Sequence, residues 1–269
     1  MMPNKLLGQH FLKNPSVAKN IIRALAPTAD DFILEVGPGN GELTSLLAEE
    51  CQKVGGKILA IEKDAALAEQ LKKEKRWENV EIVHGDVLTI LPTLPAIHGR
   101  KYKIVGNIPY YLTGHLLRIV SELSARPERA VFMVQKEVAE RAVAEPPRMN
   151  RLAASIQFWA IPKIASIVTK QNFAPQPKID SAILVLDSRS DKAAVPTDQY
   201  YAAVRALFAQ PRKTILNNLR AAQKEHEDKE KLVKGLNGLG IKPESRPQNL
   251  RVLDITAIAA MFFGDNLMA

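Results

Sequence analysis

The sequence predicts an α/β protein: a mostly parallel sheet with helices on both faces, followed by a small all-helical C-terminal domain. Three observations favour this fold class. Through the first two thirds of the 269 residues, short apolar runs rich in Val and Ile alternate with helical stretches. Gly, Asp or Asn bounds these runs, as is typical of strands. From Thr197 onward only helical patterning is left. Alternating strands and helices predict a parallel sheet, because each parallel crossover is made by a helix.

The elements follow one another in regular order. The first five strands are expected at Phe32–Val36, Lys57–Glu62, Val80–His84, Tyr102–Gly106 and Arg129–Val134. Helices are expected between and after them, at Glu42–Glu50, Ala65–Lys75, Gly114–Leu123 and Lys136–Ala144. A helix at Leu152–Trp159 and two strands, near Ile164–Thr169 and Ser181–Asp187, complete the sheet. The polar, proline-terminated segment 188–196 then predicts a linker between a Rossmann-like domain, 1–187, and a helical domain, 197–269.

The composition indicates where the chain works and what it binds. Lys and Arg outnumber Asp and Glu by 37 to 29, which gives a net charge of +8 and favours a polyanionic partner, although many basic proteins bind no nucleic acid. The single cysteine, Cys51, cannot form an intrachain disulfide, and no apolar run is long enough for a signal peptide or a membrane span. We therefore expect a cytoplasmic protein with no membrane or metal partner, and a monomer by default.

Three features at successive strand ends predict a cofactor site. The turn after the first strand, Glu35-Val-Gly-Pro-Gly-Asn-Gly41, places glycines at 37, 39 and 41, where a ligand can approach the backbone. The dinucleotide fingerprint would need glycine at 42, where the chain has Glu42, so NAD and FAD are disfavoured and S-adenosylmethionine, which carries no phosphate, is favoured.

Acids at the next two strand ends extend this site. Glu62 ends the second strand, where a carboxylate accepts from ribose hydroxyls. Asp86 and Val87 follow the third strand, where the Asp86 carboxylate can accept from the adenine amine of the cofactor. Each feature alone is equally consistent with a structural turn or a helix cap, and the prediction rests on their order along the chain.

The fourth strand ends in Asn107-Ile108-Pro109-Tyr110, which matches the signature of amino-group methyltransferases except at Ile108. The amine of adenine is a poor nucleophile because its lone pair is delocalised into the ring. The Asn107 side-chain oxygen and the Ile108 carbonyl can accept its two hydrogens and favour a more nucleophilic nitrogen. Tyr110, held by the rigid Pro109, offers an aromatic face to a base unstacked from RNA. The alternative is a turn with a buried tyrosine.

These segments resemble the KsgA family of ribosomal RNA adenine dimethyltransferases, and the resemblance covers nearly the whole chain. The similar segments are Leu7-Gly-Gln-His-Phe-Leu12, Ile33-Leu-Glu-Val-Gly-Pro-Gly39, Ile61-Glu62, Gly85-Asp86, Gly106-Asn-Ile-Pro-Tyr-Tyr111, Gln135-Lys-Glu-Val-Ala-Glu-Arg141 and Phe173-Ala-Pro-Gln-Pro-Lys-Ile-Asp-Ser181. The residues that the resemblance assigns to the cofactor pocket are His10, Leu12, Gly37, Glu62, Asp86 and Asn107. It also implies that Phe173 closes the target-base pocket opposite Tyr110. The chain departs from the family at His10, where Asn is usual, and in the loop 145–152, which has no tyrosine before Arg151.

The resemblance implies dimethylation of two adjacent adenosines near the 3′ end of 16S rRNA in the immature small subunit, as part of subunit maturation. The segment Gln210–Leu219 looks like the small-subunit group. We expect it and the following residue to present Arg212, Lys213 and Arg220 on a helix for phosphate contacts, although these are also ordinary exposed basic residues. Three alternatives stay open: a large-subunit methyltransferase of the macrolide-resistance type, a non-catalytic RNA-binding assembly factor on the same fold, and a DNA adenine methyltransferase.

Overall fold

The computed structural model describes residues 10–29, 31–74, 76–94, 101–189, 194–222 and 229–264. Residues 7–9 of the N-terminal motif and 190–193 of the expected linker lie outside this part. Two compact units are distinguished by their internal contacts: residues 1–140 with 161–188, and residues 141–160 with 189–269. Residues 141–160 thus group with the C-terminal helices, whereas the domain limits expected from the sequence remain a prediction.

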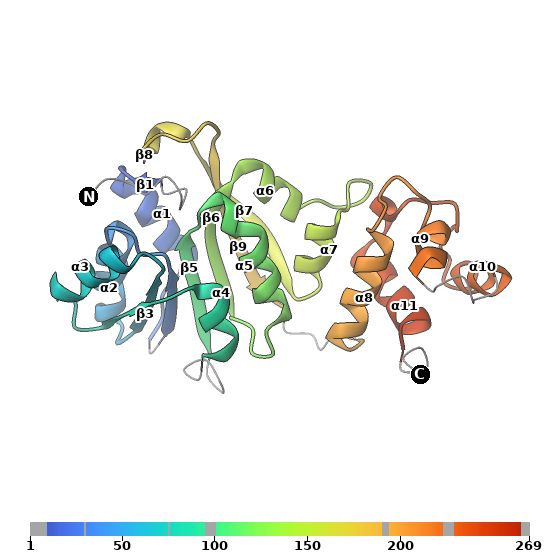
Figure 1. Cartoon of the computed structure of the whole chain (residues 1–269), viewed down its shortest axis with the longest axis horizontal. Helices are drawn as coiled ribbons and strands as arrows, with labels where there is room; N and C mark the ends of the chain where they lie inside the picture. Colours follow the sequence, from blue (N-terminus) through green and yellow to red (C-terminus); the bar gives the residue numbers. More distant parts are fainter. Residues whose placement is uncertain are drawn as a thin grey trace. The chain divides into compact units, whose positions relative to one another are not determined.

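The first unit is built on a seven-stranded sheet with the order β4-β3-β2-β5-β6-β9-β7 (Figure 1). Its strands are β2 (Phe32–Val36), β3 (Lys57–Glu62), β4 (Val80–His84), β5 (Tyr102–Asn107), β6 (Arg129–Gln135), β7 (Ala160–Val168) and β9 (Ser181–Ser188). Strands β2 to β6 pair in parallel, and β9 runs antiparallel to β6. All seven strands expected from the sequence are present, and the mostly parallel α/β sheet is confirmed.

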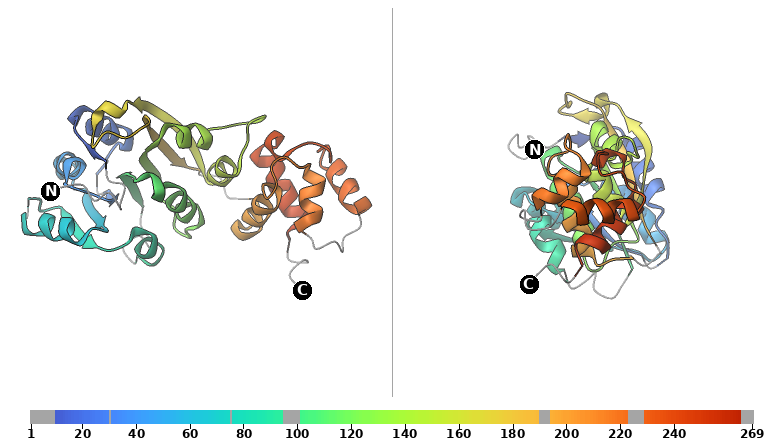
Figure 2. Two further views of the ribbon diagram at one scale, coloured as in Figure 1. Left: turned by 45° about the horizontal axis from the view of Figure 1, so that its top comes forward. Right: turned by 90° about the vertical axis from the view of Figure 1, so that its right-hand side faces the viewer.

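Helices cover both faces of this sheet (Figures 1 and 2). They are α1 (Pro15–Leu25), α2 (Glu42–Lys53), α3 (Ala65–Glu74), α4 (Val87–Ile90), α5 (Tyr110–Glu122) and α6 (Lys136–Ala142), with 3₁₀ turns η2 (Leu91–Thr93) and η4 (Lys170–Asn172). Apolar residues of α1 and α2 form one core with Ile33, Val105 and Val131 of the sheet. The helix expected at Gly114–Leu123 begins four residues earlier, directly after Pro109, because proline has a backbone angle compatible with a helix start.

Helix α1 was not expected from the sequence, although its signals are local. Asn14 caps it by accepting from the Ser16 amide at 3.0 Å, and Pro15 occupies the first helical position. The apolar residues that α1 buries are Val17, Ala18, Ile21, Ile22 and Leu25. Their helical spacing gives one apolar stripe, which is enough to hold the helix against the sheet.

The second unit is helical in its C-terminal part, as expected (Figure 2). Its elements are α7 (Arg151–Gln157), α8 (Thr197–Leu207), α9 (Ile215–Ala222), α10 (Lys229–Gly238), η5 (Pro247–Asn249) and α11 (Val252–Phe262). Phe158 stacks on Tyr200 with ring centroids 3.8 Å apart, so α7 belongs to the same apolar core as α8.

The topology brings the predicted site segments together. The chain moves outward from β2 through β3 to β4, and then returns to the other side of β2 with β5. At this switch point Val36 at the end of β2 pairs with Gly106 of β5, and β3 ends beside β4, where Glu62 pairs with His84. Ligands of open α/β sheets bind beyond strand ends at such a point.

A short second sheet crosses the same region. Strand β1 (Phe11–Leu12) pairs antiparallel with β8 (Phe173–Ala174), so that two segments separated by about 160 residues lie side by side. We refer to residues 10–14 as the N-terminal strap.

Candidate active site

One pocket opens at the carboxyl ends of β2, β3, β4 and β5, and its wall includes every catalytic and cofactor residue predicted from the sequence. These residues are His10, Leu12, Gly37, Gly39, Glu62, Asp86, Val87, Asn107, Ile108, Pro109, Tyr110 and Phe173. The structure also brings in residues that were not predicted to line the site: Phe11, Glu35, Val36, Pro38, Glu42, Leu43, Ile61, Lys63, Gly85, Tyr111 and Leu112. Several of these adjoin a predicted residue, and that adjacency was the signal available in the sequence.

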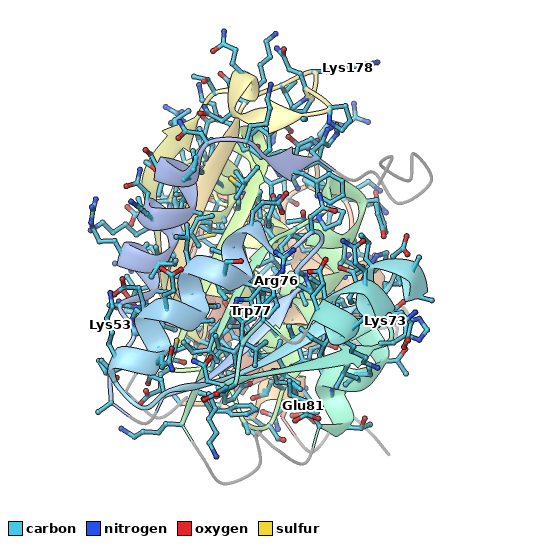
Figure 3. All side chains as sticks on the ribbon, turned by 90° about the vertical axis from the view of Figure 1, so that its left-hand side faces the viewer. Lys53, Lys73, Arg76, Trp77, Glu81 and Lys178 are labelled. Carbon is cyan, nitrogen blue, oxygen red and sulfur yellow. The ribbon has the colours of Figure 1, made fainter. Side chains whose placement is uncertain are left out.

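The glycine turn has the backbone that its sequence predicts. Gly37, Gly39 and Gly41 all have positive φ, at 66°, 62° and 86°. The space at Gly39 is also tight, because a Cβ there would lie 3.0 Å from the ring of Phe11. Trp77, which is labelled in Figure 3, lies close to the other end of the turn, because a Cβ at Gly41 would be 3.0 Å from its ring. The turn is therefore held between the N-terminal strap and the segment after α3.

Glu62 connects the end of β3 to this turn. Its carboxylate accepts from the Gly39 amide at 3.0 Å and from the Asp64 amide at 2.8 Å, and its side chain is buried. Burial raises the pKa of Glu62, while these two hydrogen bonds oppose the rise. A carboxylate can accept more than two hydrogen bonds, so Glu62 retains acceptor capacity toward the pocket.

Asp86 both caps a helix and forms an ion pair. One carboxylate oxygen accepts from the Leu88 amide at the start of α4, and the other lies 2.8 Å from Lys63 Nζ. Burial would raise the pKa of Asp86, but the hydrogen bonds from Lys63 and Leu88 outweigh it and lower this pKa. The helix-cap alternative thus describes part of what Asp86 does, and its contact with a cofactor adenine stays a prediction.

Glu35 is a functional candidate that sequence reasoning missed. It is the last residue but one of β2, is 1% exposed, and lines the pocket. Its Oε2 atom is buried without a hydrogen-bond partner among the residues that the structure describes. Burial raises the pKa of Glu35 to about 8, and the nearby Glu62 adds to this rise. A buried, unpaired acceptor in a pocket wall is suited to a ligand that brings a donor.

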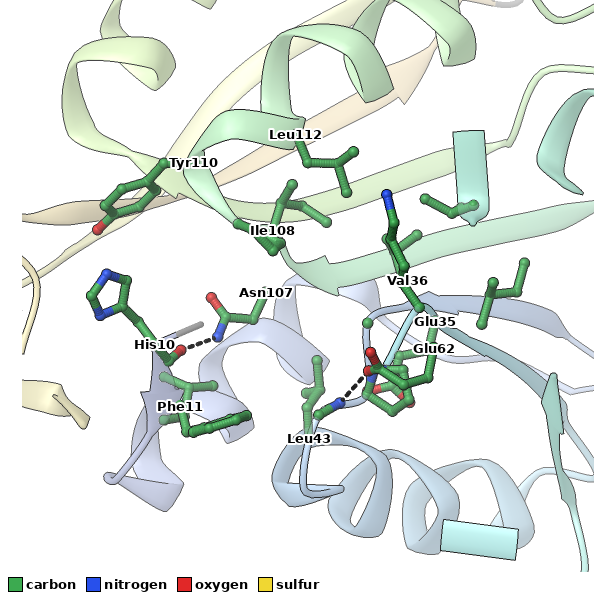
Figure 4. A pocket seen from close by; sticks show the side chains of 18 of the residues that line it. His10, Phe11, Glu35, Val36, Leu43, Glu62, Asn107, Ile108, Tyr110 and Leu112 are labelled. Atoms are coloured by element: carbon green, nitrogen blue, oxygen red, sulfur yellow. Dashed lines mark hydrogen bonds between the residues drawn. The ribbon is translucent and has the colours of Figure 1, made fainter. Parts of the chain in front are cut away.

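Asn107 is held in one orientation. Its side-chain Nδ2 donates to the backbone oxygen of His10 at 2.9 Å. Because only the NH₂ end of an amide can donate to a carbonyl, this contact fixes the position of Oδ1, which points into the pocket on the side of Tyr110 (Figure 4). Asn107 therefore presents an acceptor where the sequence predicts one.

The two aromatic residues predicted for the target base differ in accessibility. Tyr110 is half-buried, and its hydroxyl lies 3.1 Å from Ser181 Oγ. Phe173 also lines the pocket, but it is 1% exposed and packs in the core with Leu12 and Val168. Tyr110 has a face open to a ligand, whereas the stacking role of Phe173 remains a prediction.

The basic residues expected to contact RNA are all exposed, but they do not share a helix. Arg212 and Lys213 lie in the turn before α9, and only Arg220 is on it. The buried Asn218 side chain braces this turn. It accepts from the Gln210 amide at 3.0 Å and donates to the Gln210 and Thr214 carbonyls at 3.1 and 3.0 Å. These bonds replace the helical turn that the sequence led us to expect.

The described ranges hold neither a metal site nor a membrane-spanning helix. No group of three or more His, Cys, Asp or Glu there could hold a metal ion. No helix there is long and apolar enough to cross a membrane.

The sheet order and the pocket at its switch point define the class: an S-adenosylmethionine-dependent methyltransferase. A family model described as ribosomal RNA adenine dimethylase matches residues 2–262. The chain belongs to this family.

Individual relatives match nearly the full length of the chain. The ribosomal RNA small subunit methyltransferase A of Ligilactobacillus salivarius is 38% identical over 93% of this chain and 86% of its own length. The protein of that name from Dehalococcoides mccartyi (strain BAV1) is 36% identical over 97% of this chain and 89% of its own length. Among solved structures, a dimethyladenosine transferase from Plasmodium falciparum has a TM-score of 0.76 and 26% identity, covering 93% of this chain and 96% of the other. The 23S rRNA methyltransferase ErmE shares the fold, with a TM-score of 0.72 and 23% identity over 94% of this chain and 99% of its own.

Proposed function

We propose that this protein dimethylates two adjacent adenosines near the 3′ end of 16S rRNA in the immature small ribosomal subunit, and so contributes to subunit maturation. The observation that carries the proposal is the Asn107 amide, whose oxygen faces the pocket because its nitrogen is bonded to His10. The small subunit as substrate is supported by the full-length relatives named ribosomal RNA small subunit methyltransferase A. A cytoplasmic site of action and a monomeric catalyst complete the proposal.

The residues of the pocket fit S-adenosylmethionine. Glu35 Oε2 is buried with no hydrogen-bond partner in the described part of the chain, which suits a polar ligand that supplies one. Glu62 lies at the end of β3 with acceptor capacity for ribose hydroxyls, and the positive-φ turn lets a ligand approach the backbone at Gly37 and Gly39. When bound, the cofactor supplies an electrophilic methyl group on its sulfonium.

The contribution of the protein is positioning and electrostatics. In the first transfer Asn107 Oδ1 and the Ile108 carbonyl would accept the two hydrogens of the target amine, and in the second transfer one of them would accept the single hydrogen left, which holds the nitrogen lone pair in line for methyl transfer. Tyr110 supports the base on its ring face, a contact worth about 1–3 kcal/mol. No charged base is needed for the attack, because the amine loses its proton after the new bond has formed.

The exposed basic turn of the second unit is the proposed phosphate contact. Arg212 and Lys213 are exposed on a turn whose backbone the Asn218 side chain fixes. Arg220 adds a third cation at the end of α9. Such contacts supply affinity and orientation rather than base recognition.

The second candidate is a methyltransferase of the large subunit, favoured by the similarity in fold to the 23S rRNA methyltransferase ErmE. The small subunit is preferred because the relatives that are 36–38% identical over nearly the full chain carry its name. An RNA-binding factor without activity is disfavoured by the intact Glu62, Asp86 and Asn107-Ile-Pro-Tyr110.

The test is methyl transfer from tritiated S-adenosylmethionine, run in parallel on unmodified small subunits, large subunits and duplex DNA. Label in the small subunit alone supports the proposal. Label in the large subunit would transfer the assignment to the resistance type, and label in DNA to a DNA methyltransferase. Absence of label from all three would favour a binding factor.

A further inference from the structure

His10 makes three contacts that join separate parts of the pocket. Its backbone oxygen accepts from Asn107 Nδ2 at 2.9 Å. Its ring nitrogen Nδ1 donates to the Pro175 carbonyl at 2.7 Å. Its ring lies 5.7 Å from the ring of Tyr110, centroid to centroid, at an angle of 36°. One residue therefore touches the predicted catalytic amide and the predicted base-stacking ring (Figure 4), and it also touches the segment that follows β8.

The Asn107 contact determines which atom faces the substrate. If the amide were rotated by half a turn, its oxygen would face the His10 oxygen, and two acceptors would meet without a hydrogen between them. The hydrogen bond to His10 therefore selects the orientation in which Oδ1 is available to the target amine. This selection works only while the His10 oxygen stays in place.

The position of that oxygen depends on how the N-terminal strap is anchored. The strap is held by the β1–β8 pair, by the Lys13 amide on the Asn172 carbonyl at 2.8 Å, and by Asn14 Nδ2 on Asn172 Oδ1 at 2.9 Å. All of these contacts lie on the C-terminal side of His10. The β1–β8 pair has only two residues in each strand, which is too few to be stable alone. The bond from the imidazole to Pro175 is the anchor on His10 itself.

We propose, on the basis of the methyl-transfer function above, that His10 is a positioning residue for the target amine. Its imidazole, bonded to Pro175, holds the His10 backbone oxygen, and that oxygen orients the Asn107 amide. The same imidazole limits the movement of the Tyr110 ring. The N-terminal strap thus links the segment around Asn107 to the segment around Phe173.

The experiment compares two substitutions of the same side chain. In asparagine the side-chain nitrogen is separated from Cβ by the same number of bonds as Nδ1 of histidine, so His10→Asn keeps a donor for Pro175 and removes only the ring. His10→Ala removes both. Lys13→Ala is the matched control, because its exposed side chain lies outside the pocket wall and its backbone bond to Asn172 remains.

For His10→Ala we expect kcat for methyl transfer to fall about tenfold, the change that corresponds to the loss of one hydrogen bond of ordinary net strength. The value of kcat is taken at saturating S-adenosylmethionine and the dissociation constant of the cofactor is measured in parallel, because the resemblance also assigns His10 to the cofactor pocket and a role there would change cofactor affinity alone. His10→Asn should restore most of kcat, and Lys13→Ala should match wild type.

A second readout observes Asn107 directly. Its side-chain NH₂ signals in ¹⁵N-labelled protein, assigned by their loss in Asn107→Ala, should shift and exchange faster in His10→Ala but not in His10→Asn. Unchanged kcat and unchanged NH₂ signals in His10→Ala would overturn the proposal. Equal impairment of His10→Asn and His10→Ala, or a loss confined to cofactor affinity, would overturn it as well.

The test also gives an answer if His10→Ala does not fold or if the wild-type protein shows no methylation. If His10→Ala does not fold, the Asn107 signals of His10→Asn decide: signals like those of wild type support the proposal, and shifted signals contradict it. If wild-type protein methylates no substrate, the proposed function fails, and the Asn107 signals still report on His10.

Discussion

Removing the Glu62 carboxylate should lower both folding stability and cofactor affinity. In Glu62→Ala the Gly39 amide, which now donates to the carboxylate at 3.0 Å in a buried site, loses its partner. A buried donor left unsatisfied costs about 1–3 kcal/mol of folding stability. The proposed hydrogen bonds to the cofactor ribose are lost too, and a bond to a charged acceptor is worth about 1.5–3 kcal/mol.

The expected result in a binding assay is therefore a rise of roughly 10- to 150-fold in the dissociation constant of S-adenosylmethionine. Calorimetric titration of the cofactor measures this, with thermal unfolding recorded in parallel. Glu62→Gln keeps one acceptor oxygen and should fall between the alanine variant and wild type. Glu69→Ala on α3 is the control, because Glu69 is exposed and its ion pair with Lys72, at 3.9 Å, contributes little. An unchanged dissociation constant in Glu62→Ala would refute the ribose assignment.

Three further predictions concern catalysis, folding and RNA binding. Asn107→Ala should lower kcat by about a hundredfold or more while RNA affinity in a filter-binding assay stays near wild type. Glu35→Gln should raise the melting temperature of the cofactor-free protein more at pH 8 than at pH 5. The pKa of Glu35 is raised from 4.5 to about 8 in the folded protein. Between these two pH values the unfolded chain releases this proton and the folded protein keeps it, so the free energy of unfolding falls as the pH rises, by up to about 5 kcal/mol. Arg212→Ala and Lys213→Ala should each reduce the slope of log affinity against log salt by about 1.

Each of these predictions has an outcome that contradicts it. Near-normal turnover by the Asn107 variant would remove the amide from the mechanism. If Glu35→Gln changes the melting temperature equally at pH 5 and at pH 8, the Glu35 carboxyl is not held protonated. An unchanged salt slope in both basic-turn variants would place the phosphate contacts elsewhere on the chain.

The sequence predicted the sheet well because its signals are local. The runs at Phe32–Val36, Lys57–Glu62 and Val80–His84 are rich in β-branched residues, and the structure has strands with the same limits. The pocket followed from this, since the carboxyl ends of neighbouring parallel strands meet at one edge of a sheet. Residues as far apart as Gly37 and Asn107 could thus be assigned to one site before their contacts were known.

The features that could not be predicted from the sequence depend on contacts between distant segments. The pairing of Phe11–Leu12 with Phe173–Ala174 joins two-residue strands that have no detectable local pattern. The burial of Phe173 is a consequence of that packing, as is the bond between His10 and Pro175. Likewise, the turn at Arg212 and Lys213 is set by the buried Asn218 side chain rather than by helix propensity.

The protein is proposed to methylate the exocyclic amine of adenine in small-subunit RNA, using the pocket around Asn107. Mass spectrometry of nucleosides from unmodified small subunits, incubated with the protein and S-adenosylmethionine, tests it most directly. We expect N6,N6-dimethyladenosine at two neighbouring positions near the 3′ end of the RNA, formed about a hundredfold or more slowly with Asn107→Ala. Methyl groups on any other base or on a ring nitrogen, or dimethyladenosine produced equally by the Asn107 variant, would contradict the claim.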